Sequence, residues 1–312
     1  METKTNNIDR LFESVAAKGH VCLGLDTSAE YVPPKMREGG SDADAVWAFN
    51  KALIDLTLDA VACYKVQIAY YEEMGLAGLS AYSKTLRYIR TNGGLVIADV
   101  KRGDIADTAR RYANAHFSGD FEADFVTLSP YMGMDSIEPW LDAAKEKGKG
   151  AFALMRTSNK GMRDFQYLEV PGKNGADGEA KRVYHAVGDK LAELASAYSG
   201  DSGYGAFGAV VGCTERDEAA QIRKKYSNLF FLIPGYGAQG GAADDAALLL
   251  REGSGGVVNA SRSILLAWIN ETRKSGADEA EATCAFAAEA ARRAAIEMRD
   301  AIRAAASPAV KA

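Results

Sequence analysis

The residues most capable of chemistry stand together in GLVIADVKRGDIADTARRY, at positions 94–112. An apolar run leads directly into Asp99, Lys101 and Asp104. Asp99 and Lys101 are two positions apart, so on a β-strand their side chains lie on the same face. A lysine within a buried strand is costly unless an opposite charge accompanies it. The pattern therefore predicts a lysine that is held beside a carboxylate in a functional site.

A lysine in that setting can donate its proton to a carbanion that forms next to it. The neighbouring carboxylates keep the ammonium charged, because an opposite charge favours the ionised form, and they repel an anionic group on a substrate. Two unit charges about 4 Å apart interact by about 4 kcal/mol at an effective dielectric constant near 20. Lys65, inside the apolar run at 63–69, is a second such lysine. For Asp104, which follows the run, a helix N-cap is the alternative interpretation.

A second candidate site lies in IPGYGAQGG, at 233–241, followed by Arg262. Glycine-rich turns bring backbone N–H groups close to an anion, and an arginine binds phosphate through two parallel hydrogen bonds. Alone, the glycine pattern is equally typical of a plain turn. Together with an arginine that ends the next apolar segment, it favours a phosphate site.

The elements that must position these residues form a repeated pattern. Short apolar segments stand at 20–26, 63–69, 95–101, 124–130, 150–156, 208–214, 229–235 and 256–262. Helical stretches separate most of them, at 42–60, 78–91, 105–117, 135–147, 178–198, 215–226 and 242–252. Strands that alternate with helices predict a parallel sheet with helices outside it. Eight such units favour a closed (β/α)₈ barrel, a TIM barrel of the α/β class, over a doubly wound open sheet.

In a parallel barrel the active site forms at the carboxyl ends of the strands. The residues on or directly after the expected strand ends include Asp26, Lys65, Asp99, Lys101, Arg156, Thr157, Ser158, Pro234 and Arg262. Packing gives no reason to place charges at so many of these ends. We therefore expect one active site that collects them.

We expect residues 1–312 to form a single domain. A helix at about 8–18 is placed to close the amino-terminal end of the barrel. An alanine-rich helix at about 277–305 is expected to cover the barrel or lie near a dimer contact, because alanine is the best helix former and its small side chain permits close packing. The segment 157–205, polar and glycine-rich in part, is interpreted as a surface loop, and the tail 307–312 as frayed.

Composition excludes several classes of function. The net charge is −5 with a pI near 5.4, so nucleic acid is not expected as a partner. No apolar run approaches the roughly 20 residues of a membrane span, so no membrane partner is expected. The four cysteines form no C-x-x-C pair and are expected to be free thiols in a reducing cytoplasm. The three histidines lack metal-ligand spacing, and no Walker A or dinucleotide fingerprint appears, so neither a metal nor a cofactor is expected.

These features indicate an enzyme for a phosphorylated small molecule, either a phosphosugar lyase, an isomerase or a decarboxylase. DVKRGDIADT, at 99–108, also resembles the D-x-K-x-x-D-I-x-x-T signature of the orotidine 5′-phosphate decarboxylase family. GLDTS, YKVQIAYYE, MRTSN, PGYGAQGG and Arg262 occur in the order of that family, so the resemblance covers most of the chain. The long segment at 157–205 is similar to an insertion in the bacterial branch of that family, whose chains are larger.

The resemblance implies that orotidine 5′-phosphate is the substrate and uridine 5′-phosphate the product. It implies that Lys101 protonates C6 of the pyrimidine as carbon dioxide leaves. Asp99 would lie beside the substrate carboxylate and hold Lys101. Lys65 would extend the charge array and contact the ribose, and Asp26 would bind a ribose hydroxyl. The family needs no metal or organic cofactor.

The resemblance also implies a homodimer with shared active sites. It further assigns residues to the pyrimidine and phosphate ends of the nucleotide. Asp104 would come from the neighbouring subunit, with Ile105 and Thr108 beside it. The remaining substrate-binding residues would be Thr157, Ser158, Pro234, Gln239, Gly240, Gly241 and Arg262. Ser158 would bind the pyrimidine edge, and Gln239 would bridge base and phosphate. Arg262 and the backbone at Gly240 and Gly241 would hold the phosphate, and Tyr236 would help to close the site.

Two alternatives remain open on the sequence. A ketogulonate-phosphate decarboxylase or hexulose-phosphate synthase shares the D-x-K-x-x-D element but uses Mg²⁺ with a sugar phosphate. The TSN and GAQGG segments argue against it. A barrel that binds a nucleotide as a regulator, without turnover, is the second. The costly pair of Asp99 and Lys101 argues against that function, because binding alone does not need it.

Overall fold

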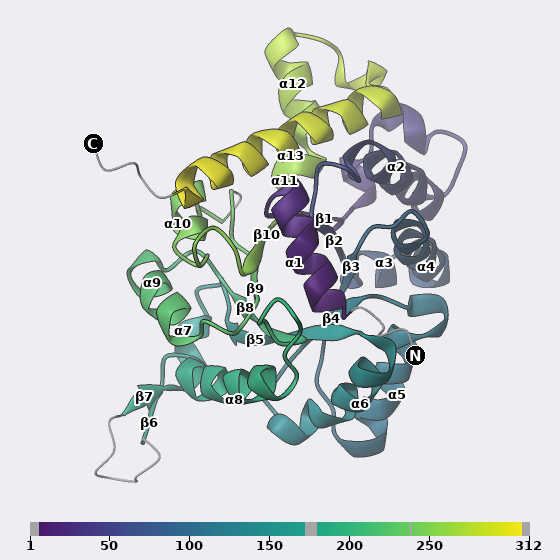
Figure 1. Ribbon diagram of the computed structural model, residues 1–312. Coiled ribbons are helices and arrows are strands. Elements are labelled where there is room, and N and C mark those ends of the chain that lie inside the picture. The colour runs from purple at the N-terminus through teal and green to yellow at the C-terminus, as the bar shows by residue number, and fades with distance from the viewer. Residues whose placement is uncertain (1–5, 172–179, 238, 308–312) are drawn as a thin grey trace, which may run out of the picture.

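The computed structural model describes residues 6–171, 180–237 and 239–307. Within them, eight parallel strands close into a barrel in the order β1-β10-β9-β8-β5-β4-β3-β2. The barrel strands are β1 (Val21–Gly24), β2 (Cys63–Gln67), β3 (Val96–Arg102), β4 (Phe125–Leu128), β5 (Gly150–Arg156), β8 (Phe207–Val211), β9 (Phe231–Ile233) and β10 (Gly256–Ala260). Each expected strand segment overlaps one of them, so the TIM barrel is confirmed (Figure 1).

Helices surround this barrel. The longer ones are α2 (Asp42–Thr57), α4 (Gly75–Thr91), α5 (Ala106–Phe117), α6 (Glu138–Lys147), α8 (Val183–Ala197), α9 (Arg216–Lys225) and α12 (Ala267–Ser275), and the shorter ones are α3 (Ala69–Glu72), α7 (Met162–Phe165), α10 (Ala243–Ala247) and α11 (Arg262–Leu265). Short 3₁₀ turns lie at Ala29–Tyr31, Pro34–Arg37, Gly119–Phe121, Met134–Ser136 and Glu279–Glu281. Among the described residues, no helix is long and apolar enough to cross a membrane.

The first helix, α1 (Asn7–Lys18), closes the amino-terminal end of the barrel, and it lies in front of the strands in Figure 1. Asn6 caps it, because its side chain accepts a hydrogen bond from the Ile8 N–H. Ile8, Leu11 and Val15 are buried in one cluster with apolar residues of the barrel interior. The Asn7 amide also reaches the Asp124 carbonyl, at 3.3 Å. The helix therefore serves as the floor of the site above it.

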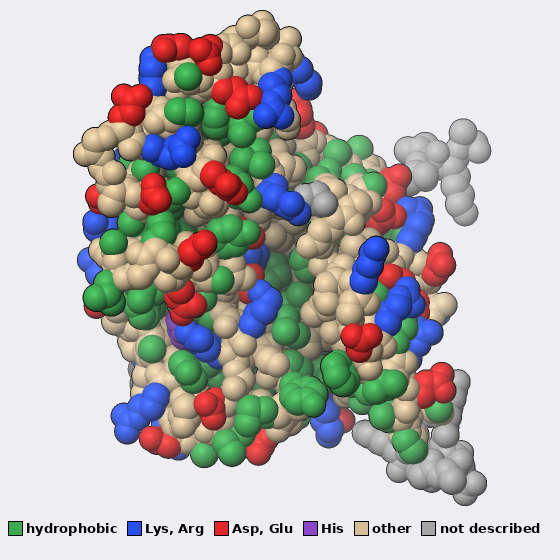
Figure 2. Space-filling model, turned by 180° about the vertical axis from the view of Figure 1, so that it is seen from behind, with side chains coloured by type: hydrophobic (Ala, Val, Ile, Leu, Met, Phe, Trp, Pro, Cys, Tyr) green, Lys and Arg blue, Asp and Glu red, His purple; other side chains and the backbone are tan. Residues whose placement is uncertain are grey.

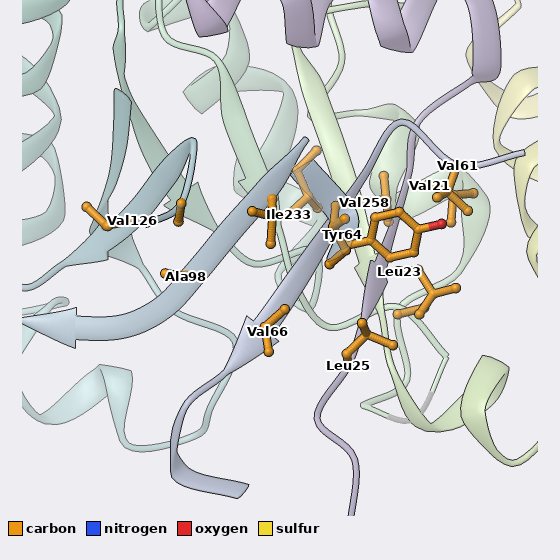
Figure 3. Close-up of a cluster of buried hydrophobic side chains, with 14 of the residues drawn as sticks. Val21, Leu23, Leu25, Val61, Tyr64, Val66, Ala98, Val126, Ile233 and Val258 are labelled. Carbon is orange, nitrogen blue, oxygen red and sulfur yellow. The ribbon is translucent and has the colours of Figure 1, made fainter. Parts of the chain in front are cut away.

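Strand side chains alternate between two environments, and this alternation decides which residues can reach a site in the barrel. Leu23, Tyr64 and Val66 point outward into the apolar layer beneath the helices (Figure 3). Their sequence neighbours point inward: near the amino ends these are apolar, as at Cys63. Near the carboxyl ends the inward positions become polar, as at Lys65. The barrel thus has an apolar floor and a charged rim.

The last helix, α13 (Cys284–Ala306), begins later than the expected residue 277. Thr283 caps it by accepting a hydrogen bond from the Phe286 N–H at 3.2 Å, and the preceding residues include a separate 3₁₀ turn. A face of small residues that includes Ala287 and Ala291 is buried, and α13 packs against α2. The expected frayed tail lies outside the described residues, apart from Ser307.

The segment at 157–205 contains the helix that was expected at 178–198, which is α8, and it is more ordered than the surface loop that was expected around this helix. It carries α7, a short antiparallel pair of β6 (Glu169–Val170) and β7 (Lys181–Arg182), and α8. α8 packs against β5 and β8 as part of the helical layer. At Gly188 a Cβ atom would lie 2.6 Å from the Tyr226 ring, so only glycine permits this contact. Residues 172–179, the centre of the glycine-rich stretch, lie outside the described residues.

Candidate active site

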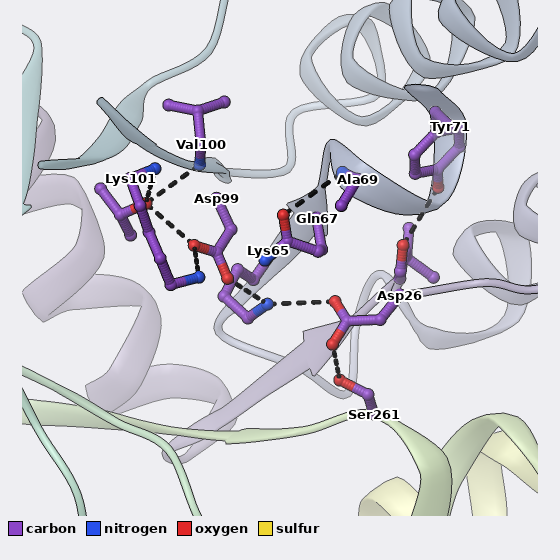
Figure 4. A network of polar contacts seen from close by, with 11 residues as sticks. Asp26, Lys65, Gln67, Ala69, Tyr71, Asp99, Val100, Lys101 and Ser261 are labelled. Carbon is purple, nitrogen blue, oxygen red and sulfur yellow. Dashed lines mark hydrogen bonds and ion pairs between the residues drawn. The ribbon is translucent and has the colours of Figure 1, made fainter. Parts of the chain in front are cut away.

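Four charged side chains form one continuous chain of ion pairs at the carboxyl end of the barrel (Figure 4). The Lys65 ammonium donates to Asp26 Oδ1 at 3.0 Å and to Asp99 Oδ2 at 2.8 Å. The Lys101 ammonium donates to the other oxygen of Asp99, at 2.7 Å. Ser261 donates to Asp26 Oδ2 at 2.8 Å. The structure thus brings Asp26, which follows β1, together with the lysines and the aspartate of β2 and β3, as the sequence predicted. Ser261, which follows β10, was not anticipated.

Burial and charge act in opposite directions on this array. Burial by itself lowers the pKa of Lys65, but the carboxylates of Asp26 and Asp99 outweigh it, so that the pKa lies above its ordinary value. Burial by itself raises the pKa of Asp99, but Lys65 and Lys101 outweigh it and lower that pKa. Lys65 and Asp99 are therefore both ionised at neutral pH.

A bulge in β3 shapes the position of Lys101. Ala98 pairs with Val126 and Arg102 pairs with Leu128, so three residues of β3 face the single residue Thr127 of β4. Lys101 has a φ of 43°, in the left-handed region that non-glycine residues rarely adopt. Simple strand alternation therefore does not place this lysine, although its ammonium does reach Asp99 as expected.

The ion pairs line a cavity of about 410 Å³ inside the barrel mouth. The cavity walls include Asp26, Lys65, Gln67, Asp99, Lys101, Thr127, Leu154, Thr157, Ser158, Asn159, Val210, Leu232, Pro234, Gln239 and Asn259. A second cavity, of about 400 Å³, shares four of these residues and extends to Arg262. The shared residues are Asp26, Pro234, Gln239 and Asn259. Together the two cavities offer room for an elongated ligand with one end at the lysines and the other at the arginine.

Several lining residues were not anticipated, namely Gln67, Thr127, Asn159 and Asn259. Three of them occupy inward positions of barrel strands, so the alternation that finds Lys65 also finds Gln67 two residues later. Asn259 lies on β10 with a buried side-chain oxygen that has no hydrogen-bond partner among the described residues. Arg156, in contrast, is fully buried away from both cavities and donates to the Gly212 and Glu215 carbonyls.

The expected pyrimidine contacts differ in how free their hydroxyls are. Thr157 donates to Asn159 at 2.6 Å and accepts from Gln166 at 2.9 Å, so its hydroxyl is already engaged. Ser158 faces the cavity, and its hydroxyl makes no hydrogen bond to the described part of the chain. Ser158 is therefore the hydroxyl that is available to a ligand.

The glycine-rich loop after β9 is held by its own backbone. The Gly240 N–H donates to the Gly237 carbonyl at 2.9 Å, and the Gly241 N–H donates to the Gly235 carbonyl at 3.0 Å. Gly240 has a φ of 94°, which favours glycine. In this conformation neither N–H group is available to an anion, so binding through them requires the loop to rearrange.

The side chains around this loop are better placed for a ligand. Gln239 lines both cavities, while Tyr236 and Arg262 line the second. The Arg262 guanidinium is exposed and has no hydrogen bond or ion pair to the described residues. Ala238 is outside them. An unpaired arginine at one end of the groove is a ready site for an anionic group.

Asp104, Ile105 and Thr108 are not brought to the site within one chain, because none of them lines either cavity. Asp104 Oδ1 accepts a hydrogen bond from the adjacent Ile105 N–H at 2.8 Å. The N-cap of α5 is Ile105, which makes no side-chain cap, so Asp104 is not a helix cap either. Ile105 and Thr108 are exposed on the rim.

Large apolar side chains are also exposed at the carboxyl side of the barrel strands. They are Ile105, Tyr131, Met132 and Phe165, on the segments that follow β3, β4 and β5. The Tyr131 and Phe165 rings lie 6.5 Å apart in an edge-on arrangement. Figure 2 shows the face opposite α1, where hydrophobic side chains gather below a hollow in the surface. No group of three or more His, Cys, Asp or Glu within the described residues is arranged to hold a metal ion.

Comparisons with known proteins agree on one family. Residues 19–273 match the model of the orotidine 5′-phosphate decarboxylase / HUMPS family. The orotidine 5′-phosphate decarboxylase of Clostridium acetobutylicum is 55% identical, over 95% of this chain and 98% of its own. That of Clostridium perfringens is 53% identical, over 95% and 97%. The solved structure of Leishmania donovani OMP decarboxylase has a TM-score of 0.71 at 30% identity, and the match covers 97% of this chain and 99% of that one.

Proposed function

The chain belongs to the orotidine 5′-phosphate decarboxylase family, and from this premise we propose how its residues carry the reaction. The protein is a carboxy-lyase that converts orotidine 5′-phosphate to uridine 5′-phosphate and carbon dioxide, the last step of de novo pyrimidine nucleotide synthesis. The observation that carries our assignment of roles is the chain of ion pairs from Asp26 to Lys101 at one end of an elongated groove. The match to the family model and the 55% identical relative confirm the family that the sequence resembled.

Lys101 is the proton donor in this proposal. Lys65 is locked between two carboxylates and its side chain is 6% exposed, whereas the Lys101 side chain is 47% exposed and has one carboxylate partner. Lys101 is therefore the lysine that can move its ammonium toward a ligand. When the bond from C6 to the carboxylate breaks, its electron pair stays on C6 and carbon dioxide leaves. A proton from Lys101 then forms the new C–H bond, and solvent restores the ammonium.

Asp99 directs this step by charge. It remains ionised, so a substrate carboxylate placed beside it is repelled until carbon dioxide leaves. Lys65 holds Asp99 on its other oxygen, at 2.8 Å, and in this proposal it also contacts the ribose of the bound nucleotide. Asp26, at the junction of the two cavities, is placed to bind a ribose hydroxyl. Preorganised charge of this kind stabilises developing charge without reorganisation of water.

The remaining contacts orient the nucleotide. Arg262 binds the phosphate and Gln239, which lines both cavities, bridges the phosphate and the base. Ser158 binds the pyrimidine edge, and Pro234 forms part of the wall between the two ends. Thr157 supports this edge through the residues to which its hydroxyl is bonded. Gly240 and Gly241 join the phosphate site only after their loop rearranges, and Tyr236 moves with that loop. Binding energy from the phosphate thus helps to assemble the site.

We further propose a homodimer in which each subunit completes the site of the other. Asp104, Ile105 and Thr108 are the residues that the partner would supply. Their absence from both cavities of one chain supports this, and so do the exposed apolar side chains on the same rim.

We also propose that each chain forms one domain. All four cysteines are free, which supports a reducing, cytoplasmic environment.

We propose that the reaction uses no metal and no organic cofactor, because Lys101 and Asp99 supply both the proton and the charge that it needs. A spectrophotometric assay of orotidine 5′-phosphate with and without EDTA tests this. The expected result is conversion to uridine 5′-phosphate at the same rate in both. Lack of conversion by the folded protein, together with Mg²⁺-dependent turnover of a sugar phosphate, would instead favour the alternative branch of the superfamily.

A further inference from the structure

We propose that Thr127 is a positioning residue, whose hydroxyl holds Asp99 and Lys101 in the geometry that decarboxylation requires. This inference rests on the function proposed above and adds a residue to it. Thr127 lies on β4, next to β3, and it is 1% exposed. Its Oγ1 donates to Asp99 Oδ1 at 2.9 Å and accepts from the backbone N–H groups of Val100 and Lys101, at 3.0 and 2.9 Å.

These three hydrogen bonds use the full capacity of a hydroxyl, which has one proton and two lone pairs. The two N–H groups can only donate and therefore occupy both lone pairs. The hydroxyl proton is left to Asp99, whose carboxylate can only accept. Thr127 thus has no donor or acceptor left for a ligand, so its effect on the reaction passes through Asp99 and Lys101.

The bulge in β3 explains why a hydroxyl is needed at this place. Three residues, 99–101, face Thr127 alone, so the regular backbone ladder between β3 and β4 is interrupted. Without Thr127, the N–H groups of Val100 and Lys101 would lose their acceptor in the barrel wall. The side chain takes over the function of a backbone carbonyl and closes the gap in the ladder.

Backbone strain is concentrated at the same point. Lys101 has a φ of 43°, a conformation that costs free energy for a residue with a Cβ atom. The hydrogen bond from its N–H to Thr127 holds that conformation, and the conformation directs its side chain back to Asp99. Asp99 Oδ1 accepts from Lys101 and from Thr127 together. One hydroxyl therefore fixes both the proton donor and the carboxylate that orients it.

Thr127→Val removes the hydroxyl and keeps the shape of the side chain. We expect kcat for orotidine 5′-phosphate to fall by about 100-fold, since a displacement of reacting groups of the order of 1 Å has that effect. The dissociation constant of uridine 5′-phosphate is expected to stay within about twofold, because the residues that bind phosphate and base are untouched. Thr127→Ser restores the hydroxyl and should recover most of kcat.

A matched control separates positioning from general stability. Thr272 on α12 is also 1% exposed, and its hydroxyl donates to the Trp268 carbonyl at 2.7 Å. Thr272→Val loses a buried hydroxyl of similar kind away from the charged array, so its kcat should be unchanged. Should Thr127→Val fail to fold, Thr127→Ser and Thr127→Cys form a second pair that differs in one atom. The weak hydrogen bonds of sulfur predict a kcat at least about 10-fold lower for the cysteine variant.

The outcomes are distinct. Folded Thr127→Val with kcat within about twofold of the unmodified protein would overturn the proposal. Equal losses of kcat and nucleotide affinity, or a serine variant no better than the valine or cysteine variant, would also overturn it. If the unmodified protein itself does not decarboxylate orotidine 5′-phosphate, the proposed function fails first and this inference fails with it.

Discussion

The Lys65 ammonium lies 2.8 Å from Asp99 Oδ2, and both side chains are more than nine-tenths buried, at 6% and 8% exposed. Lys65 also holds Asp26 at 3.0 Å. One buried cation therefore compensates two carboxylates, and its loss leaves them facing each other in the barrel. Breaking a buried pair by removing one partner is far more costly than losing a surface pair.

Replacing Lys65 with methionine should lower the free energy of unfolding by about 3–5 kcal/mol, because the carboxylates of Asp26 and Asp99 lose their common cation. Urea unfolding of both proteins at neutral pH measures the difference. Lys51→Met is the control, since Lys51 on α2 pairs with Asp55 at the surface, and a much smaller change is expected there. If Lys65→Met is no less stable than Lys51→Met, the buried ion pairs of Lys65 do not stabilise the fold as argued.

Lys101→Ala should reduce kcat by at least about 1,000-fold, because the variant has no other group placed to give C6 its proton. Asp99 keeps Lys65 and Thr127 as partners in this variant, so the fold and the groove should persist. Binding of uridine 5′-phosphate, followed by calorimetry, should therefore remain measurable. Turnover close to that of the unmodified protein would remove Lys101 from the role of proton donor.

Stability should depend on pH through His116, which lies on α5 beside the rings of Phe121 and Trp140. Burial there, and secondarily the charge of Arg102, lowers the pKa of His116 to about 4, from an ordinary 6.5. Between these values the unfolded chain binds a proton that the folded chain does not, so acid favours unfolding. This loss of stability is nearly absent above pH 6.5 and grows as the pH falls towards 4.

Through His116 alone, the free energy of unfolding should fall by about 2 kcal/mol between pH 7 and pH 5. Other groups titrate in the same range, so the comparison must be made against His116→Phe, which cannot bind the proton. The free energy of unfolding should fall by about 2 kcal/mol more in the unmodified protein than in the variant over that range. Parallel pH profiles for the two proteins would show that His116 is not held neutral by the fold.

The sequence was sufficient to predict the barrel and the charged array, because both depend on local patterns. Lys65 and Asp99 stand out as charges within apolar strands, and parallel strands bring their carboxyl ends to one edge. Thr127 did not stand out, since threonine is an ordinary strand residue. Its importance arises from the bulge opposite it, and nothing in the residues at 99–101 distinguishes a bulge from a regular strand.

The differences in the helices have similar causes. Residues 277–283, rich in alanine and acidic residues, are compatible with a helix, but Thr283 ends that possibility by capping α13. The helix α12 was not anticipated, because no element was assigned between Arg262 and residue 277. Asp104 lies outside both cavities of its own chain, and the site that we propose for it belongs to a second copy.

The proposal that the active sites are shared can be tested by mixing inactive subunits. If Asp104 acts in the partner's site, a hybrid of Lys101→Ala and Asp104→Ala subunits contains one site with both native residues. Random exchange makes about half of the dimers hybrid, so about a quarter of the unmodified activity should return. Lys101→Ala mixed with Asp99→Ala is the matched control and should regain nothing, because Asp99 and Lys101 belong to the same subunit's array. If subunit exchange is demonstrated by a label and the first mixture stays as inactive as the control, Asp104 does not act across the dimer.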